Sequence, residues 1–341
     1  MMKKNIHTTI SGSLPKPSWL AETGKLWGQW KLSGTELDQA KADAMKIVVS
    51  DQINAGISII TDGEQTRQHF VTTFIENLSG VDFKRKKTVR IRDRYDAAVP
   101  MVVDKINRKK SVFVNDVRLL RSLTSKPIKF TLPGPMTMID TLYDDYYKSR
   151  EKLAWRFAEV LNEEVKELVK AGVDIIQFDE PAFNVFFDEV HDWGVQTLER
   201  AIKNVRCKTA VHICYGYGIE ANIKWKNSLG KEWRQYEKVF PLLSNSKIDQ
   251  VSLECINSRV PMELISLLQK KDIMVGAIDV ATNKIETPRQ VANILKQALK
   301  YTSIKHLIGC TNCGMVTMPR EIANAKLKAL ADGAALLSRE L

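Results

Sequence analysis

The clearest chemical signal in the sequence is a histidine and a cysteine, His212 and Cys214, which lie two residues apart in the apolar run AVHICYGYG. On a strand, residues two apart share a face and lie ~6.6 Å apart along the chain, so their side chains can lean together. Both are common zinc ligands, with bonds of ~2.0–2.3 Å. A hydrogen-bonded histidine beside a buried thiol explains the same pattern, so the pair alone leaves both interpretations open.

Two further residues enlarge this pair to a set of four. Glu254 ends DQVSLE, the next strand-like run along the chain, and Cys313 follows the last such run within the stretch CTNC. Histidine, carboxylate and two thiolates form a good tetrahedral set, and the thiolates favour zinc over magnesium or calcium. The sequence therefore predicts a zinc site made by His212, Cys214, Glu254 and Cys313. Taken alone, Glu254 could equally cap a helix or join a salt bridge.

The CTNC stretch also permits other interpretations. Cys310 could replace Glu254 and give a closed structural Cys3His site in a non-enzymatic binding module, or the two thiols could be redox-active. We favour Cys313 as the ligand and Cys310 as a residue of the cavity wall. Cys207 precedes its strand and Cys255 should point away from Glu254, so both are predicted to be packing residues.

Two carboxylates follow other strand-like runs. Glu64 lies in TDGEQTR and Asp179 in IIQFDEPAF, and at one rim they could bind a cationic group such as an amine. Ion pairs, for example with Arg67, are the alternative. The turns GSLP (12–15) and LPGP bring backbone to the same rim, where an amide or the Ser13 hydroxyl could hold a carboxylate. Together these groups suit an amino acid with a metal-binding tail.

The elements that must position these residues alternate between strand and helix. Eight β-branched runs each end in polar or glycine residues, and helical patterns lie between them. This repeat predicts an α/β fold, a (β/α)8 TIM barrel, whose chemistry gathers at the carboxyl ends of its strands. A doubly wound sheet would usually show a glycine-rich phosphate turn after its first strand, which SGSLPKP is not. The eight runs are residues 7–11, 56–62, 128–134, 173–180, 209–214, 249–254, 273–279 and 304–309.

The clearest helical pattern covers 149–170, and similar patterns cover 39–55, 193–205, 287–300 and 319–337. A basic, strand-containing insertion of about 80–126 separates the second and third strands. We expect one catalytic domain, 1–341. The basic run at 84–94 lacks a nucleic-acid motif or suitably spaced aromatics, so a solvated hairpin face is favoured over nucleic-acid binding. Docking of an acidic partner or anionic carrier is the third option.

Composition narrows the protein class. The chain has 341 residues, with 51 Lys and Arg against 40 Asp and Glu, a net charge of +11 that favours acidic partners in general. The N-terminus lacks the apolar core of a secretory signal, and no apolar stretch approaches the ~18 residues of a membrane span. Five cysteines, an odd number in a long chain, are typical of reduced thiols. We therefore expect a cytoplasmic protein that binds neither membrane nor nucleic acid.

The motifs in this order resemble the cobalamin-independent methionine synthases, specifically their catalytic C-terminal barrel. The resemblance spans nearly the whole chain and rests on GSLP, TDGEQTR, IIQFDEPAF, VHICYG, LEC, GAIDV and NCG. It implies a zinc ion held by the four ligands named above, with Cys313 rather than Cys310 as the last. It also implies a homocysteine site, in which Ser11, Ser13 and their turn hold the carboxylate. Glu64 and Asp179 hold the amine and are the implied catalytic residues.

The same resemblance implies the reaction, in which a zinc-bound homocysteine thiolate attacks a methyl group and gives methionine. The folate-using enzymes have a second, N-terminal barrel, and they carry a histidine where this chain has Ala281. The sequence is therefore most similar to the short, folate-independent core methionine synthases. We expect a donor other than methyltetrahydrofolate, together with a methyl-carrier or oxygenase-like partner protein. Methyl transfer involving another small thiol in a corrinoid-linked pathway is the alternative.

Overall fold

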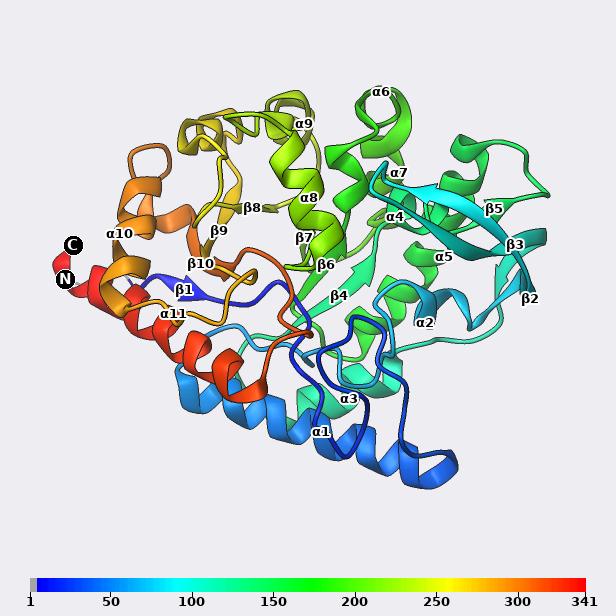
Figure 1. Ribbon diagram of the computed structural model, residues 1–341, viewed down its shortest axis with the longest axis horizontal. Helices are drawn as coiled ribbons and strands as arrows, with labels where there is room; N and C mark the ends of the chain where they lie inside the picture. Colours follow the sequence, from blue (N-terminus) through cyan, green and yellow to red (C-terminus); the bar gives the residue numbers. More distant parts are fainter. Residues whose placement is uncertain (1–4) are drawn as a thin grey trace.

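The computed structural model describes residues 5–341 and is built around one curled sheet of parallel strands (Figure 1). Its strand order is β1-β10-β9-β8-β7-β6-β4. The chain therefore adds strands around the sheet nearly in sequence order, as a (β/α)8 barrel requires. The strands are β1 (His7–Thr8), β4 (Lys129–Pro133), β6 (Ile175–Asp179), β7 (Lys208–His212), β8 (Gln250–Glu254), β9 (Asp272–Ile278) and β10 (Leu307–Thr311).

The segment 57–62 closes the ring between β1 and β4. The Ile59 amide donates to the Thr8 carbonyl at 3.0 Å, and the Lys129 amide donates to the Ile60 carbonyl at 2.8 Å. Its pairing is too short to count as a regular strand, because the Ser58 hydroxyl replaces backbone groups opposite Thr8 and Pro127 on the other side has no N–H to donate. The expected barrel is confirmed, with this one run reduced to a bridge.

Helices cover the outside of the barrel and follow the patterns that the sequence predicts. The long helix α5 begins where Ser149 accepts a hydrogen bond from the Lys152 amide, and α10 begins at a capping box of Thr287 and Gln290. Two helices between β7 and β8, α8 and α9, were not predicted. The helices are α1 (Gly34–Ala55), α2 (Thr72–Ile75), α3 (Val114–Leu123), α4 (Pro135–Ile139), α5 (Arg150–Lys170), α6 (Phe187–Glu189), α7 (Val195–Ala201), α8 (Glu220–Ser228), α9 (Gln235–Ser244), α10 (Pro288–Ala298) and α11 (Arg320–Glu340).

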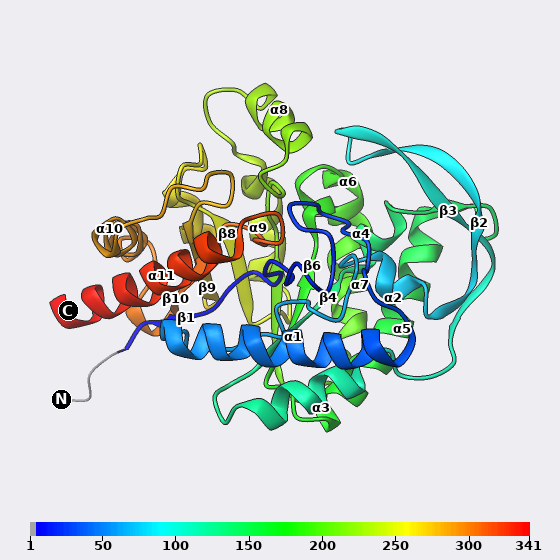
Figure 2. The same cartoon turned by 60° about the horizontal axis from the view of Figure 1, so that its bottom comes forward.

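The basic insertion folds as a long hairpin, which confirms the strand-containing insertion. Its strands are β2 (Leu78–Ile91) and β3 (Tyr95–Arg108), and the short strand β5 (Tyr143–Asp144) pairs with β3. Figure 2 shows the hairpin at the side of the barrel, curving back so that its turn is directed toward α8. The hairpin begins two residues before the predicted boundary. A single catalytic domain stays a prediction.

The barrel strands are rigidly packed, which fixes the groups at their ends. Every residue of β4, β6, β8 and β10 is buried. Residues that directly follow these strands are therefore anchored to a close-packed core and have little freedom to move. In the described range 5–341, no helix is both long and apolar enough to cross a membrane.

Candidate metal and substrate site

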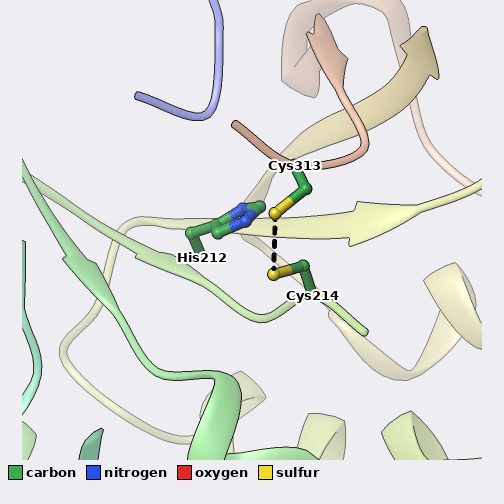
Figure 3. A group of neighbouring side chains, drawn as sticks. All are labelled: His212, Cys214 and Cys313. Atoms are coloured by element: carbon green, nitrogen blue, oxygen red, sulfur yellow. Dashed lines mark hydrogen bonds between the residues drawn. The ribbon is translucent and has the colours of Figure 1, made fainter. Parts of the chain in front are cut away.

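Three of the four predicted metal ligands meet at one point. His212 is the last residue of β7, Cys214 lies two residues beyond it, and Cys313 lies two residues beyond the end of β10. Their ligand atoms all lie within 4.8 Å of one another, and all three side chains are buried. Figure 3 shows the imidazole and the two thiols pointing toward one another. This cluster could hold a metal ion.

The imidazole of His212 is oriented for such a role. Its Nδ1 lies 2.5 Å from the Ser252 hydroxyl on the neighbouring strand β8. Its buried Nε2 finds no hydrogen-bond partner in residues 5–341. A histidine whose one nitrogen is fixed by a second group, leaving the other free, is the usual arrangement of a metal ligand.

The two thiols form a coupled pair. Cys214 Sγ and Cys313 Sγ lie 3.3 Å apart. The hydrogen bond with Cys313 and the nearby His212 lower the pKa of Cys214 well below its ordinary value, against the effect of burial. Burial first, and then Cys214, raise the pKa of Cys313 well above its ordinary value. The pair therefore offers thiolate character to a soft metal ion, which would stabilise both sulfurs in their deprotonated form.

The carboxylate of Glu254, the fourth predicted ligand, has other partners. It is buried at the end of β8, but its Oε1 lies 2.5 Å from Lys226 Nζ on α8, and its Oε2 accepts from the Tyr215 amide at 3.1 Å. It is not in the three-residue cluster. The lysine neutralises a carboxylate that would otherwise be buried and unpaired. As a metal ligand, Glu254 stays a prediction, one that requires its carboxylate to leave Lys226.

The remaining cysteines lie outside the cluster. Cys310 is buried, with its Sγ 3.9 Å from the Ser11 hydroxyl. Cys255 is also buried, and its thiol faces the Leu253 carbonyl at 3.8 Å. The cluster therefore does not contain Cys310, which the Cys3His alternative needs.

The cluster opens into a cavity of about 490 Å³. We call the part around the cluster the inner half, and every substrate residue expected from the sequence lines it. The part under the β2–β3 hairpin is the outer half. The inner half is lined by Ser11, Ser13, Glu64, Asp179, His212, Cys214 and Cys313, and the outer half includes Phe83, Lys86, Ile91, Arg92, Arg94, Tyr95, Ala97, Ala98, Val99 and Pro100.

Glu64 is held with its carboxylate toward the inner half. Its backbone φ is 57°, in the left-handed region, directly after Gly63 at 60°. Its Oε1 accepts from the Thr131 hydroxyl at 3.0 Å, and a Cβ on Gly12 would lie only 2.5 Å from that oxygen. Arg67 pairs instead with Asp62, at 2.8 Å to each oxygen. The Glu64 carboxylate is thus not the one that Arg67 pairs with.

Asp179 occupies the end of β6 beside it. Its Oδ1 accepts from Gln177 Nε2 at 2.7 Å, and Lys129 Nζ lies 2.5 Å from the Gln177 oxygen. Burial raises the pKa of Asp179 to about 7, against the lowering effect of His212. The adjacent Glu180 turns the other way and accepts hydrogen bonds from two amides at the start of α4. Only the first carboxylate of the FDEP motif therefore serves the cavity.

The two predicted serines differ in what their hydroxyls do. The Ser11 hydroxyl donates to the Thr311 carbonyl at 2.8 Å and accepts from the Thr311 hydroxyl at 3.0 Å. The Ser13 hydroxyl has no hydrogen-bond partner within the described range 5–341. Ser13 is therefore better placed to bind a substrate carboxylate, while the Ser11 hydroxyl ties β10 to the loop.

Sequence reasoning missed four residues that contact or complete this cavity. Ser252 and Lys226 carry no motif, and only the folded neighbours of His212 and Glu254 reveal them. Arg92 lies within the basic run 84–94 and Arg94 ends it, and the sequence favoured a solvated face for this run. In the structure both arginines line the outer half.

The sequence matches the family model described as "Cobalamin-independent synthase, Catalytic domain" over residues 6–336. The chain belongs to this family. The synthase is 35% identical over 337 residues to a methionine synthase of Sulfurisphaera tokodaii, covering 98% of this chain and 93% of the relative. It is 32% identical to a methionine synthase of Saccharolobus solfataricus, covering 98% of this chain and 95% of that one.

A solved structure lies nearer still. The B12-independent methionine synthase from Shewanella sp. W3-18-1, in complex with selenomethionine, is 62% identical and superposes with a TM-score of 0.97, covering 98% of both chains. A putative enzyme of the same kind from Listeria monocytogenes shares the fold, with a TM-score of 0.72 at 20% identity and 98% coverage of both chains. The expected family, fold and methionine-synthase type of enzyme are confirmed.

Proposed function

We propose that this synthase transfers a methyl group to the thiol of L-homocysteine and forms L-methionine. One observation carries the proposal, namely that a His-Cys-Cys cluster shares the inner half with two buried carboxylates and a serine hydroxyl that has no partner among the described residues. Those groups match the thiol, ammonium and carboxylate of one amino acid. The Shewanella relative was solved with selenomethionine, a close analogue of the proposed product.

The metal in this proposal is zinc, held by His212, Cys214 and Cys313, with Glu254 as a fourth ligand once it releases Lys226. The cluster fits such an ion because the buried His212 Nε2 has no hydrogen-bond partner in the described part of the chain and the two sulfurs are adjacent. When bound, zinc would keep the substrate sulfur as a thiolate near neutral pH, the form that is nucleophilic. The five cysteines of the chain are free, and a reducing compartment such as the cytoplasm would keep them so.

The chain's own residues place the substrate. Asp179 and Glu64 would hold the ammonium, while Ser13 and neighbouring amides would hold the carboxylate. These contacts aim the side chain at the cluster, leaving the sulfur to face the outer half. The sulfur lone pair then forms the new S–CH3 bond while the bond from methyl to donor breaks, with its electron pair remaining on the donor. Orientation of this kind is the main contribution of binding groups to a bimolecular transfer.

The donor in this proposal is not methyltetrahydrofolate. Ala281 offers no proton to a departing folate amine, and its amide donates to Asp279 at 2.8 Å. Ala281 packs against the loop after β7, where a Cβ on Gly218 would lie 2.5 Å from its Cα. A donor with a better leaving group, delivered by a methyl-carrier or oxygenase-like partner protein, fits this arrangement.

Cobalt substitution tests the binding part of the proposal. Cobalt in a cysteine-ligated site absorbs visibly, and a new thiolate ligand adds a charge-transfer band. We expect L-homocysteine to add this band and L-homoserine, which has a hydroxyl instead, to leave the spectrum unchanged. A spectrum unaffected by homocysteine would overturn the proposal. A stronger response to another small thiol would point to the corrinoid-linked alternative.

Growth and product assays test the reaction. A methionine auxotroph without methionine synthase should grow on homocysteine when it carries this chain, whereas the Cys313→Ala variant should not support growth. Purified protein with methyltetrahydrofolate should form no methionine, and adding cell extract should restore product. Product formed from the folate alone would contradict the donor assignment without touching the homocysteine assignment.

A further inference from the structure

The cavity is larger than its inner half needs. Its volume of about 490 Å³ lies in the range of ~300–1,000 Å³ that is typical of pockets for drug-sized ligands. One small amino acid at the cluster leaves the outer half for a second molecule. Residues of the β2–β3 hairpin form much of its wall, and the wall is largely apolar along Ala97–Pro100.

The hairpin turn places one charged side chain inside this wall. Arg92 and Asp93 have φ angles of 45° and 54°, and the Arg94 amide donates to the Ile91 carbonyl at 2.9 Å. This is the geometry of a two-residue hairpin turn with both central residues left-handed. Arg92 is only 8% exposed and lines the cavity, while Asp93 is exposed.

The guanidinium of Arg92 is incompletely satisfied by protein. Its Nη1 forms an ion pair with Asp140 Oδ2 at 3.3 Å, but neither of these two atoms makes a hydrogen bond within the described residues. Among residues 5–341, no group accepts a hydrogen bond from its Nε or its Nη1. A buried donor without an acceptor costs free energy, and an anionic ligand would recover it. A guanidinium can grip a carboxylate or a phosphate through two parallel hydrogen bonds.

Arg94 places a second cation on the same wall. Its Nη1 donates to the Tyr215 carbonyl at 3.3 Å and to Asn222 Oδ1 at 3.2 Å, and its guanidinium lies 3.7 Å from the centre of the Trp225 ring. Its Nε and Nη2 are buried and have no acceptor in the described chain. Gly216 allows this approach, since a Cβ there would lie 3.0 Å from Nη1.

The other charged groups at this end leave the two arginines in excess. Lys86 also lines the outer half, and Glu76 lies on the same cavity wall. Asp140 is already paired with Arg92. The inner half, by contrast, carries the carboxylates of Glu64 and Asp179. The two ends of one cavity therefore favour ligand groups of opposite charge.

We propose that the outer half is the methyl-donor site and that it recognises the donor by an anionic group, a carboxylate or a phosphate, bound to Arg92 and Arg94. The donor carries this anion on an apolar body that packs along Ala97–Pro100. This inference rests on the proposed function for its assignment of the inner half to homocysteine. The anion selects the donor at the hairpin, and the methyl end faces the cluster.

Small anions with an apolar ring test the site directly. Phenyl phosphate, benzoate and uncharged benzyl alcohol are titrated calorimetrically into the metal-loaded protein, in a buffer without phosphate or carboxylate. We expect at least one of the two anions to bind, and the stronger of them reveals whether phosphate or carboxylate is preferred. The Arg92→Gln substitution should raise the Kd of the stronger-binding anion at least tenfold, and the Kd of the Arg92→Lys variant should lie between those of wild type and Arg92→Gln. The control is Arg85→Gln on the same hairpin, where the exposed Arg85 pairs with Asp82 and should not affect binding.

Three results would overturn the inference. These are no binding of either anion, an unchanged Kd in both Arg92→Gln and Arg94→Gln, or benzyl alcohol binding as tightly as the anions. Homocysteine titration of the cobalt protein separates this inference from the proposed function. If Arg92→Gln loses the anion but keeps the homocysteine band, folding is intact and the inference is supported. If wild type binds the anion through Arg92 but shows no homocysteine band, the anion site stands while its assignment to a methyl donor falls.

Discussion

The two halves of the cavity are built by different parts of the chain and on different principles. The inner half consists of side chains at the ends of parallel strands, and its main groups are thiols, an imidazole and carboxylates. The outer half is walled largely by one inserted hairpin, which contributes the buried Arg92 and the partly buried Arg94. The barrel thus supplies the thiols, imidazole and carboxylates, whereas the insertion supplies a separate, arginine-bearing surface.

The difference also shows in how the charged groups are supported. Inner groups are held by neighbouring barrel residues, as when Ser252 holds His212 and Gln177 holds Asp179. Arg94 of the outer half is held by the loop after β7 and by α8, which itself carries Lys226 against Glu254. Helix α8 therefore contacts both Arg94 of the outer half and Glu254, the predicted fourth metal ligand. If the halves act independently, a change at one should leave binding at the other intact, and variants can test this.

The largest effect is expected from removing a thiol of the cluster. Cys214→Ala should abolish stoichiometric metal binding and lower methionine formation by roughly a thousandfold or more, since ~4 kcal/mol of transition-state stabilisation corresponds to that factor. Metal content by elemental analysis and product by chromatography measure both. Phenyl phosphate should still bind at the outer half.

Cys255→Ala is the matched control, because this buried thiol lies outside the cluster. It should keep both metal and activity. Loss of anion binding in Cys214→Ala would show that the two halves are coupled, and full metal content in that variant would refute the ligand assignment.

A smaller effect is expected at the substrate carboxylates. Glu64→Gln keeps the hydrogen bond from Thr131 but removes the charge that would hold the homocysteine ammonium. A charge-assisted hydrogen bond is worth ~1.5–3 kcal/mol, so kcat/KM for homocysteine should fall by roughly 10–100-fold with metal content unchanged. Steady-state kinetics with varied homocysteine measure this. If kcat/KM for the methyl donor fell instead, and kcat/KM for homocysteine did not, Glu64 would act at the other end of the cavity.

The next effect concerns the support of the imidazole. Ser252→Ala removes the hydroxyl 2.5 Å from His212 Nδ1. Loss of such an outer partner typically weakens metal binding by ~10–100-fold, and the lower end is expected here because two thiols remain. Competition with a chromophoric chelator gives the affinity, and Ser266→Ala, an exposed hydroxyl on the barrel's outside, serves as control. Unchanged affinity would mean that packing alone orients the ring.

The residues of the inner half could be brought together from the sequence because their positions follow from regular structure. Parallel strands of a barrel end at one rim, so His212, Glu64 and Asp179 could be placed together without coordinates. The fate of Glu254 could not be foreseen, because its partner Lys226 lies on α8, a helix with little amphipathic pattern.

The outer half could not be predicted for a different physical reason. Its position depends on how a long hairpin bends over the barrel, which no local pattern encodes. Two-residue turns with positive φ at both positions usually have the sequence Asn-Gly or Asp-Gly, but this turn has Arg92 and Asp93. From sequence alone a basic run indicates a solvated face, and only the folded turn shows that Arg92 is buried and lines the cavity.

The smallest effect is expected where the inner half rests on the barrel's outer helices. Thr66, two residues after Glu64, donates to Asp116 of α3 at 2.9 Å, and burial raises the pKa of this half-buried carboxyl to about 6. The folded protein therefore keeps the proton up to about pH 6, whereas an unfolded aspartate loses it near ~3.9. Folded protein binds more protons between these values, so stability should fall as pH rises from 4 to 6.

The Asn side chain in the Asp116→Asn variant still accepts a hydrogen bond from Thr66 but carries no charge. The substitution should therefore remove this fall and raise the free energy of unfolding at pH 7 by about 1–2 kcal/mol. Urea unfolding at several pH values measures both effects, with the KM for homocysteine at pH 7 staying within about twofold. A variant that is less stable at pH 7 would show instead that the ionised carboxylate supports the loop carrying Glu64.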